Sequence, residues 1–383
     1  MLADDVYDAF FLVPLYMAMY YGADLHIRGA VSKKLYKNAV TYLQRILCDF
    51  SDDLKQVNVY ADGFRRADGR QTLIGAGLSC GVDSLSTVYD HYVKESDPDY
   101  RINALFFFDT GWHGDFYDAG SWELCLERYR QCGEAAGEMG LPLYLVRTNF
   151  HAFTYGIYKH NRPGSHMGYF ANYSCLMALQ KVLKKYYVSN CFSYSQILNY
   201  GKYLHDSDFC EFSESYSVPL IQTESLEVVI DGCQYERSGK IERLSNWDIA
   251  RKYLNVCIRI SSSDGRAHNC SECVKCMLTL MTLDVLGKLD NFSKVFDLEA
   301  YRKNLPRWKN EIAQKHMNGK YYSNEPNPYD FLKSHGMKFP SPAEVRMSLM
   351  MSKISSLSKK ALRKIIGGKL YGRLKNLVKG QHA

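Results

Sequence analysis

The chain lacks an apolar segment long enough to cross a membrane. None of its apolar runs reaches the ~18 residues that a membrane-spanning helix needs. The strongest candidate, Ala9–Tyr21, is short and contains Pro14. Aspartates precede it at the position where a secretory signal peptide carries basic residues. We therefore expect neither a transmembrane helix nor a signal peptide.

The features of a secreted disulfide scaffold are also missing, although the chain contains twelve cysteines. Such scaffolds are short, whereas 383 residues are enough for two domains or one large domain with additions. We expect a cytoplasmic protein. Most scattered cysteines, such as Cys48 and Cys125, are expected to be small buried apolar residues.

Acidic residues are absent from the C-terminal tail. No Asp or Glu follows Glu344, and Val345–Ala383 holds ten lysines and arginines, so the chain's net charge of +7 hides a slightly acidic body. Apolar residues recur in the tail with helical spacing. Basic amphipathic helices are typical of segments that bind an anionic membrane, nucleic acid or an acidic partner, and others dock on their own domain. We expect the tail to bind an acidic partner, and we place an anionic membrane surface slightly ahead of RNA.

The common glycine-rich nucleotide motifs are missing as well. In TLIGAGLSCGVDSLSTVYDHY (Thr72–Tyr92), no lysine follows the loop and the glycines do not fit G-x-G-x-x-G. What is present is a short strand (Thr72–Leu78), a loop of small residues (Ser79–Ser84) and a helix (Leu85–Lys94). Such a turn directs backbone N–H groups and the positive end of a helix dipole at one point. It therefore predicts an anion site, with an ordinary strand–turn–helix corner as the alternative.

This loop resembles the PP-loop signature S-G-G-x-D-S of ATP pyrophosphatases. Its six positions are Ser79, Cys80, Gly81, Val82, Asp83 and Ser84, and only Cys80 departs from the signature. The resemblance implies that the loop and Leu78 bind ATP, which is cleaved between its α- and β-phosphates. It also implies that Ser79, Asp83 and Ser84 are catalytic. We expect Asp83 to orient the loop or hold Mg²⁺, and Cys80 to keep a negative φ because it carries a β-carbon.

Apolar runs alternate with helical patterns through the middle of the chain. The later strands are predicted at Ala104–Phe108, Pro142–Val146, Tyr187–Ser195 and Leu226–Ile230, with helices such as Trp122–Met139 and Asn172–Lys185 between them. This alternation predicts an α/β fold with a parallel sheet covered by helices on both faces. Ligands of such sheets bind at the carboxyl ends of the strands. We therefore expect Asp109, Thr148 and Ser193 to contact the nucleotide, although ordinary polar turns are the alternative.

Four cysteines form a second strong motif. Cys270, Cys273 and Cys276 make a C-x-x-C-x-x-C run, and Cys257 lies thirteen residues upstream. Four thiolates suit a tetrahedral zinc ion and also an iron–sulfur cluster. We expect Zn²⁺, because nothing else in the sequence indicates redox chemistry, with His268 as a substitute ligand.

Two loops of opposite charge lie among these elements. Tyr158–Tyr169 gathers basic residues around a Pro-Gly pair, and Tyr203–Phe212 contains several acidic residues. The first is interpreted as a mobile flap that closes on the triphosphate or on an acidic substrate, or as a surface loop. The second is interpreted as a magnesium site or a substrate contact.

Together the PP-loop and the later cysteine run resemble the 7-cyano-7-deazaguanine synthase group. The resemblance covers roughly Thr72–Leu289, and Cys80 and the long Cys257–Cys270 spacing indicate a divergent relative. It implies an adenine nucleotide alpha hydrolase-like, Rossmann-like fold with a structural zinc. It also implies an ATP-dependent, C–N bond-forming ligase that adenylates a carboxylate or amide oxygen for attack by a nitrogen nucleophile.

This interpretation divides the chain into an N-terminal extension (1–68), an ATP-binding domain with the zinc site (69–289) and a helical C-terminal region with the basic tail (290–383). The expected partners are ATP with Mg²⁺, a small carboxylate or amide substrate, an anionic surface for the tail and a second copy of the chain. Two other functions stay open. One is a PP-loop tRNA sulfurtransferase whose basic tail binds RNA. The other is a nucleotide-binding module that has lost catalysis.

Overall fold

The computed structural model describes residues 2–111, 113–114, 116–152, 164–199, 210–257, 269–320, 322 and 328–351. Most of the basic and acidic loops, His268 and the tail after residue 351 lie outside these ranges, so the hypotheses about them stay predictions. The chain divides into two compact units. Unit 1 is Met1–Arg302 with Tyr322–Pro326, and unit 2 is Lys303–Tyr321 with Asn327–Ala383.

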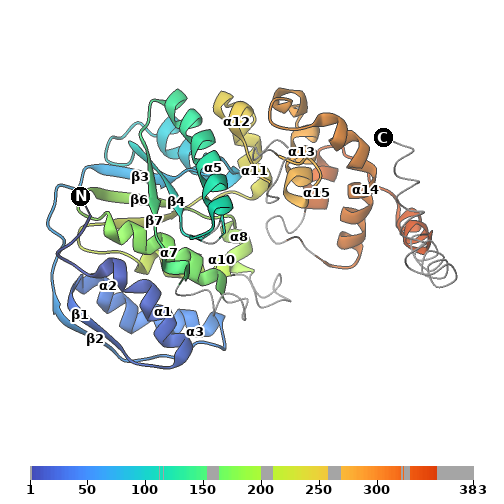
Figure 1. The fold of residues 1–383 in the computed structure, drawn as a ribbon. Coiled ribbons are helices and arrows are strands. Elements are labelled where there is room, and N and C mark those ends of the chain that lie inside the picture. The colour runs from blue at the N-terminus through green and yellow to red at the C-terminus, as the bar shows by residue number, and fades with distance from the viewer. Residues whose placement is uncertain are drawn as a thin grey trace. The chain divides into compact units, whose positions relative to one another are not determined.

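Unit 1 alternates strands and helices (Figure 1). Its strands are β1 (Leu25–Val31), β2 (Val59–Phe64), β3 (Leu73–Gly77), β4 (Ala104–Asp109), β5 (Leu143–Arg147), β6 (Leu183–Ser189) and β7 (Glu227–Asp231). Its helices before β5 are η1 (Asp8–Phe10), α1 (Leu12–Tyr21), α2 (Lys33–Asn38), η2 (Ala39–Leu43), α3 (Gln44–Phe50), α4 (Val82–Val88), η3 (Tyr89–Lys94) and α5 (Ala119–Met139). Those after β5 are α7 (Gly164–Ala178), α8 (Tyr194–Leu198), α10 (Cys210–Ser217), η4 (Val218–Leu220), α11 (Arg237–Leu244), α12 (Asp248–Tyr253), α13 (Val274–Val285), η5 (Leu289–Phe292) and the start of α14 (Leu298–Met317).

Five strands form one parallel sheet in the order β5-β4-β3-β6-β7. The strands are apolar because both faces are covered: α4 and α5 pack on one face, and α7 packs on the other (Figure 1). On the α7 side, Phe170 and Leu176 belong to one buried core with Phe106 and Tyr186 of the sheet. The predicted α/β class with a parallel sheet is therefore confirmed.

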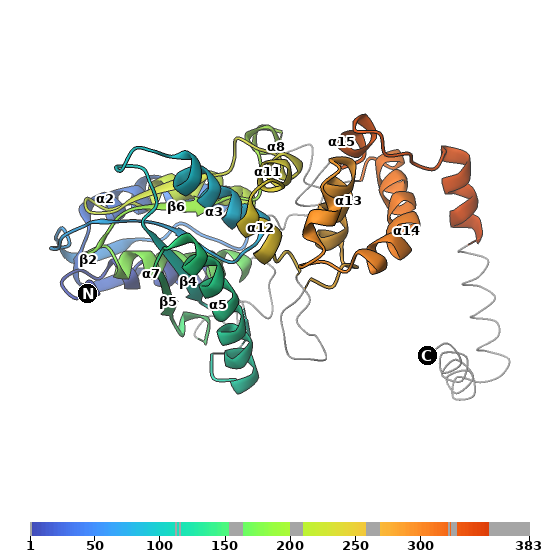
Figure 2. The ribbon, with the colours of Figure 1, turned by 90° about the horizontal axis from the view of Figure 1, so that it is seen from above.

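The order of the strands contains a reversal next to β3. The chain places β4 and β5 successively on one side of β3 and then, after α7, adds β6 and β7 on the other side. In sheets wound in this way, a crevice opens beyond the carboxyl ends of the two strands at the reversal, and ligands bind there. Here those strands are β3 and β6, and Ser79–Ser84 follows β3 directly. Helices α11 and α13 lie beyond this edge of the sheet (Figure 2).

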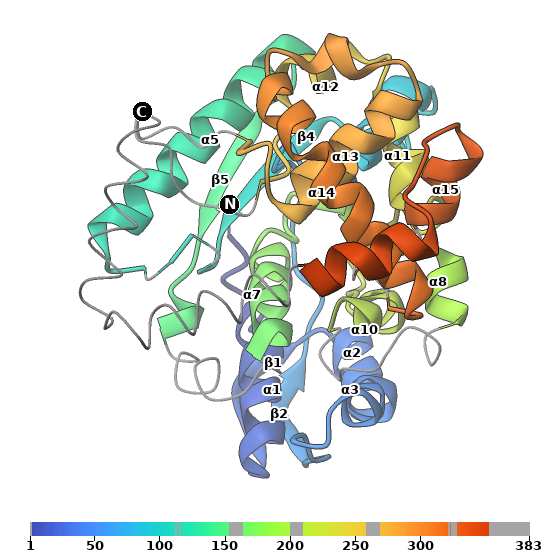
Figure 3. The same ribbon diagram turned by 90° about the vertical axis from the view of Figure 1, so that its right-hand side faces the viewer.

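The residues before β3 form a layer against the outer side of α7. Helices η1 and α1 pack on α7, and β1 pairs with β2 in a separate parallel sheet. Figure 3 shows α7 between the strands and these N-terminal elements. Leu12, Tyr16 and Met19 share the core that contains Phe170 and Leu176. Helix α7 is apolar around much of its circumference because one side packs on the sheet and the other on the N-terminal helices.

Several predicted boundaries are wrong. The helix expected from Leu85 already begins at Val82. The helix expected at Asn172–Lys185 ends at Ala178, and the strand expected at Tyr187–Ser195 is β6 at Leu183–Ser189, with α8 beginning at Tyr194. Local pattern favoured a helix through the two lysines at 184–185, but this segment pairs with both β3 and β7 in the centre of the sheet. Strand pairing and burial therefore override local propensity here. By contrast, the predicted end of α5 is confirmed, with Gly140 in the left-handed conformation at φ 69°.

Unit 2 contains most of α14, then α15 (Pro328–Ser334) and a helix over residues 342–351. The last helix starts at a capping box: Ser341 N donates to Glu344 Oε2 (2.7 Å) and Glu344 N donates to Ser341 Oγ (3.3 Å). Met347, Met350 and Met351 are exposed on it. The first part of the predicted tail helix is therefore present. Across the ranges that the structure describes, no helix is long and apolar enough to span a bilayer.

Asp8 anchors the N-terminal layer and provides a test of it. Its buried carboxylate accepts hydrogen bonds from Ser32 N (2.7 Å), Ser32 Oγ (2.5 Å) and Gln180 Nε2 (2.8 Å), and burial raises its pKa. Asp8→Ala leaves these buried donors unpaired, so we expect the free energy of unfolding to fall by about 1–3 kcal/mol. Urea denaturation of the full chain measures this. The exposed Asp49→Ala is the control, and equal effects of the two substitutions would contradict the assignment.

Candidate anion pocket and metal centre

A cavity of about 620 Å³ lies at the carboxyl edge of the sheet, beside the reversal between β3 and β6. The loop after β3 forms its floor. Side chains from β4, β6 and five helices form its walls: α5, α7, α10, α11 and α13. The cavity therefore brings together residues that are up to about two hundred positions apart in the sequence.

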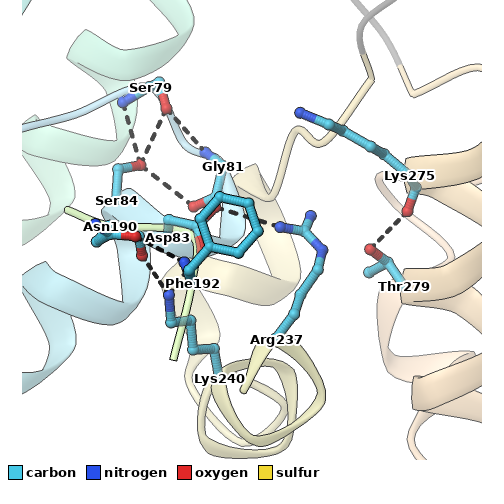
Figure 4. A network of polar contacts seen from close by, with 10 residues as sticks. All are labelled: Ser79, Gly81, Asp83, Ser84, Asn190, Phe192, Arg237, Lys240, Lys275 and Thr279. Carbon is cyan, nitrogen blue, oxygen red and sulfur yellow. Dashed lines mark hydrogen bonds and ion pairs between the residues drawn. The ribbon is translucent and has the colours of Figure 1, made fainter. Parts of the chain in front are cut away.

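The loop Ser79–Ser84 is held in shape by its own serines (Figure 4). Ser84 Oγ donates to Gly81 O (3.2 Å) and accepts from Ser79 N (3.3 Å). Since the single Ser84 hydroxyl proton is used, Ser79 Oγ donates to Ser84 Oγ over 3.1 Å. Gly81 is the N-cap of α4, whose first-turn N–H groups have no acceptor within the helix. These groups point to the cavity as donors for an anion.

Asp83 is tied to α11 by two cations. Lys240 Nζ lies 2.9 Å from Asp83 Oδ1, and Arg237 Nη1 lies 3.3 Å from Asp83 Oδ2. The Lys240 side chain is fully buried, and its Nζ also donates to Asn190 O (2.5 Å). Burial opposes ionisation of Asp83, but the charges of Lys240 and Arg237 outweigh it and lower the pKa. Because a buried lysine needs its partner, Asp83 anchors the loop to α11.

Cys80 corrects one sequence-based prediction. It was expected to keep a negative φ, but its φ is 57°, in the left-handed region that glycine favours. The conformation costs a non-glycine residue roughly 1–2 kcal/mol. Two contacts hold it there: Asn255 N donates to Cys80 O (2.8 Å), and the buried Cys80 thiol lies beside that of Cys132. Interaction with Cys80 and burial raise the pKa of the Cys132 thiol.

Three cationic side chains line the cavity, and Arg237 is one of them. Arg128 comes from α5, Arg237 from α11 and Lys275 from the first turn of α13. Figure 4 shows the Lys275 side chain extending from α13 toward the loop. Arg128 Nε is buried and has no hydrogen-bond partner among the described residues. A concave site lined by several positive charges favours a multiply charged anion.

The opposite wall of the cavity is polar but not basic. The Tyr173 hydroxyl of α7 donates to Glu214 of α10, and both side chains are buried. Asn172 lies beside Tyr173 on the same wall and accepts from Thr110 Oγ1 (2.7 Å). Burial raises the pKa of Tyr186, so this phenol stays protonated and can donate a hydrogen bond. One end of the cavity is therefore cationic. The other end carries the uncharged side chains of Asn172, Tyr173 and Tyr186 and one carboxylate, Glu214.

The four predicted cysteines come together in one cluster. Sγ–Sγ distances are 3.5 Å for Cys273–Cys276, 3.9 Å for Cys270–Cys276 and 4.0 Å for Cys257–Cys273. A metal about 2.3 Å from each of four thiolates would space them about 3.8 Å apart. Cys273 N donates to Cys270 Sγ (3.3 Å), and hydrogen bonds from Cys276 and the other thiols lower the pKa of Cys273. The cluster can therefore bind a metal ion.

The cysteine cluster is directly connected to the cavity. Cys273 is the N-cap of α13, and Lys275 lies between two of the clustered cysteines in sequence. Cys257, a third member, lines the cavity itself. An ion bound to the cluster would therefore fix the helix end that carries Lys275.

The structure brings some of the predicted nucleotide-binding residues together and separates others. Leu78 and all six loop residues line the cavity, whereas Asp109, Thr148 and Ser193 do not. Asp109 Oδ2 accepts from Arg147 Nε (2.7 Å), and Asp109 O accepts from Thr148 N (3.1 Å). Ser193 forms a capping box with Gln196 at the start of α8. Nucleotide contact by these three residues stays a prediction.

Several cavity residues were not predicted from the sequence. Lys275 had a usable signal, because it lies inside the C-x-x-C-x-x-C run at the start of a helix. Arg237 and Lys240 are three positions apart on α11 and so share a face, but nothing local indicates that their partner is Asp83. Tyr173 and Glu214 meet only through the packing of α7 against α10.

Comparison with known proteins gives no family assignment. No protein-family model matches the chain, and neither does any curated protein or solved structure with which it was compared.

The conformation of Cys80 leads to a test with a matched pair of variants. Cys80→Gly should keep the fold, since glycine relieves the left-handed strain. Cys80→Val should be about 1–3 kcal/mol less stable than the glycine variant, because a β-branched residue fits this region worst. Denaturant unfolding compares the two. Equal stability would show that residue 80 does not hold a positive φ in solution.

The cysteine cluster leads to a second test. Cys273→Ser should remove one equivalent of tightly bound metal per chain and lower thermal stability, because a structural metal contributes folding free energy. Cys48→Ser, at a half-buried cysteine outside the cluster, is the control. Metal content is measured by elemental analysis of the purified chain. Identical metal content in the wild type and the Cys273→Ser variant would rule out the cluster as the site.

Proposed function

We propose that the chain is an ATP-dependent adenylating enzyme of the PP-loop type, similar to the 7-cyano-7-deazaguanine synthase group. The observation that carries this proposal is the position of Ser79–Ser84. A loop matching five of six signature positions lies at the reversal of a parallel sheet and faces a cavity lined by cations. The strand order and the helices on both faces support the finer assignment to an adenine nucleotide alpha hydrolase-like fold.

The cationic end of the cavity suits a triphosphate. The backbone donors at the start of α4 offer an anion position, and the hydroxyls of Ser79 and Ser84, which hydrogen-bond within the loop, hold the loop in shape around it. Arg128, Arg237 and Lys275 supply the positive charge that phosphates need. Stabilising the charge that develops on pyrophosphate as it leaves is the main electrostatic task in such a reaction.

Mg²⁺ would bind the site as a complex with the triphosphate. Both carboxylate oxygens of Asp83 already lie against cations, so the loop itself offers no free acidic ligand. Magnesium commonly keeps several waters and binds through the phosphates of its substrate. We therefore assign Asp83 to orienting the loop.

The other end of the cavity suits a small acceptor with a carboxylate or amide group. An acceptor oxygen attacks the α-phosphorus, the bond to the β-phosphate breaks and pyrophosphate leaves. A nitrogen nucleophile then displaces AMP from the acceptor carbon and loses a proton. Tyr173 and Asn172 would orient the acceptor, and Glu214 is the carboxylate on this wall that can take the proton.

We further propose that the cysteine cluster binds Zn²⁺ in a structural role. Four sulfurs at tetrahedral spacing favour zinc, and the ion would hold Lys275 at the phosphates without taking part in the reaction. The alternative iron–sulfur cluster would instead favour a PP-loop tRNA sulfurtransferase.

Binding of Mg·ATP, measured by calorimetry, tests this assignment. Lys275→Ala should weaken binding roughly 10- to 100-fold, as expected for the loss of a charge-assisted contact of about 1.5–3 kcal/mol. Lys294→Ala, at an exposed lysine outside the cavity, should bind like the wild type. Equal binding by the wild type and the Lys275→Ala variant would remove this lysine from the ATP site.

The products of turnover complete the test. With a library of small carboxylic acids and an ammonium salt, ATP should yield AMP and pyrophosphate in the presence of an accepted acid. ADP and phosphate would contradict adenylation. Binding without turnover on any acceptor would favour an inactive nucleotide-binding module. Iron and co-purifying tRNA would favour the sulfurtransferase.

A further inference from the structure

A second group of metal-ligating side chains lies at the carboxyl end of β4. Asp109 ends this strand, His113 lies four residues later and Cys125 comes from α5. One ligand atom of each lies within 4.8 Å of the other two. We propose that Asp109, His113 and Cys125 form a second metal site, for a divalent cation of the zinc type, separate from the four-cysteine cluster and independent of ATP binding.

The spacing of the ligand atoms leaves room for an ion. His113 Nδ1 and Asp109 Oδ1 are 3.7 Å apart, which is longer than an ordinary hydrogen bond and within the range of an ion pair when the imidazole is protonated. Two ligand atoms bound about 2.0–2.2 Å from one tetrahedral ion lie about 3.3–3.6 Å apart. His113 Nδ1 is also buried and has no hydrogen-bond partner among the described residues. An ion between these atoms would satisfy it.

Neighbouring groups hold the ligands in place. Arg147 Nε donates to Asp109 Oδ2 over 2.7 Å, which leaves Oδ1 for a metal. The Arg147 guanidinium lies over the ring of Trp122, 3.6 Å from its centroid, and is thereby kept on Oδ2. The His113 ring stacks on Phe107 with a centroid distance of 5.4 Å. Such outer contacts are typical of metal sites, where they orient the ligands.

The ligand set indicates both the metal and its chemistry. A thiolate, an imidazole and a carboxylate together suit Zn²⁺ or Co²⁺, whereas Mg²⁺ prefers oxygen ligands only. On binding, the Cys125 thiol loses its proton to solvent and the sulfur takes the metal in its place. Three protein ligands leave a fourth position for water or an anion, as in catalytic zinc sites. His113 lines the anion pocket, so the proposed site lies at the wall of that pocket.

Cobalt titration of the full-length chain tests this site. The protein is first purified with the four-cysteine cluster loaded, and Co²⁺ alone is then added. The wild type should bind one further equivalent and develop the visible absorption of tetrahedral Co²⁺ with a thiolate ligand. His113→Ala and Cys125→Ser should each lose this equivalent. His335→Ala, at an exposed histidine of unit 2, should keep it.

Two results separate the new site from the others. Cys273→Ser should lose the metal of the cluster and still bind the additional Co²⁺ equivalent. Circular dichroism of the His113→Ala variant should match the wild type, so that the loss cannot be ascribed to unfolding. A wild type that takes up no further cobalt, or a folded His113→Ala variant that takes up as much as the wild type, would overturn the proposal.

Discussion

The reversal of strand order between β3 and β6 is the constraint on which the rest of the structure depends. Because successive strands are added first on one side of β3 and then on the other, a crevice opens beyond the carboxyl ends of these two strands. The loop after β3 therefore opens into a cavity. Every other feature of the candidate site, from the cations of α11 to the start of α13, is arranged around that opening.

Electrostatics explains how this edge of the sheet is held together. Buried Lys240 and nearly buried Arg237 require a counter-charge, and Asp83 supplies it from the loop. The same ion pairs connect α11 to the start of α4, so the loop is anchored before any ligand arrives. Lys275, held at the end of α13 by the cysteine cluster, contributes a charge from the other side of the cavity. The residues that hold this edge together therefore also line the cavity.

Much of this architecture could be predicted from the sequence. Apolar runs and their turns identified β3, β4, β5 and β7 closely, and the C-x-x-C-x-x-C run with Cys257 upstream identified the cysteine cluster. The start of β6 could not be predicted, because its lysines follow a helical pattern and only pairing with two neighbours makes the segment a strand. The positive φ of Cys80 depends on contacts with Asn255 and Cys132, both distant in sequence. Cys125 was expected to be only a buried apolar residue. The fold places it beside Asp109 and His113, which the sequence pattern around Cys125 does not indicate.

The central claim is that the opening between β3 and β6 binds a nucleoside triphosphate through Ser79–Ser84. The most direct measurement is a crystal structure of the chain with Mg²⁺ and an ATP analogue whose bridging atom between the α- and β-phosphates is carbon. The account predicts the triphosphate against the backbone N–H groups at the start of α4, with Lys275 within hydrogen-bond distance of it. An analogue bound elsewhere, or a cavity that stays empty at saturating analogue, would contradict it.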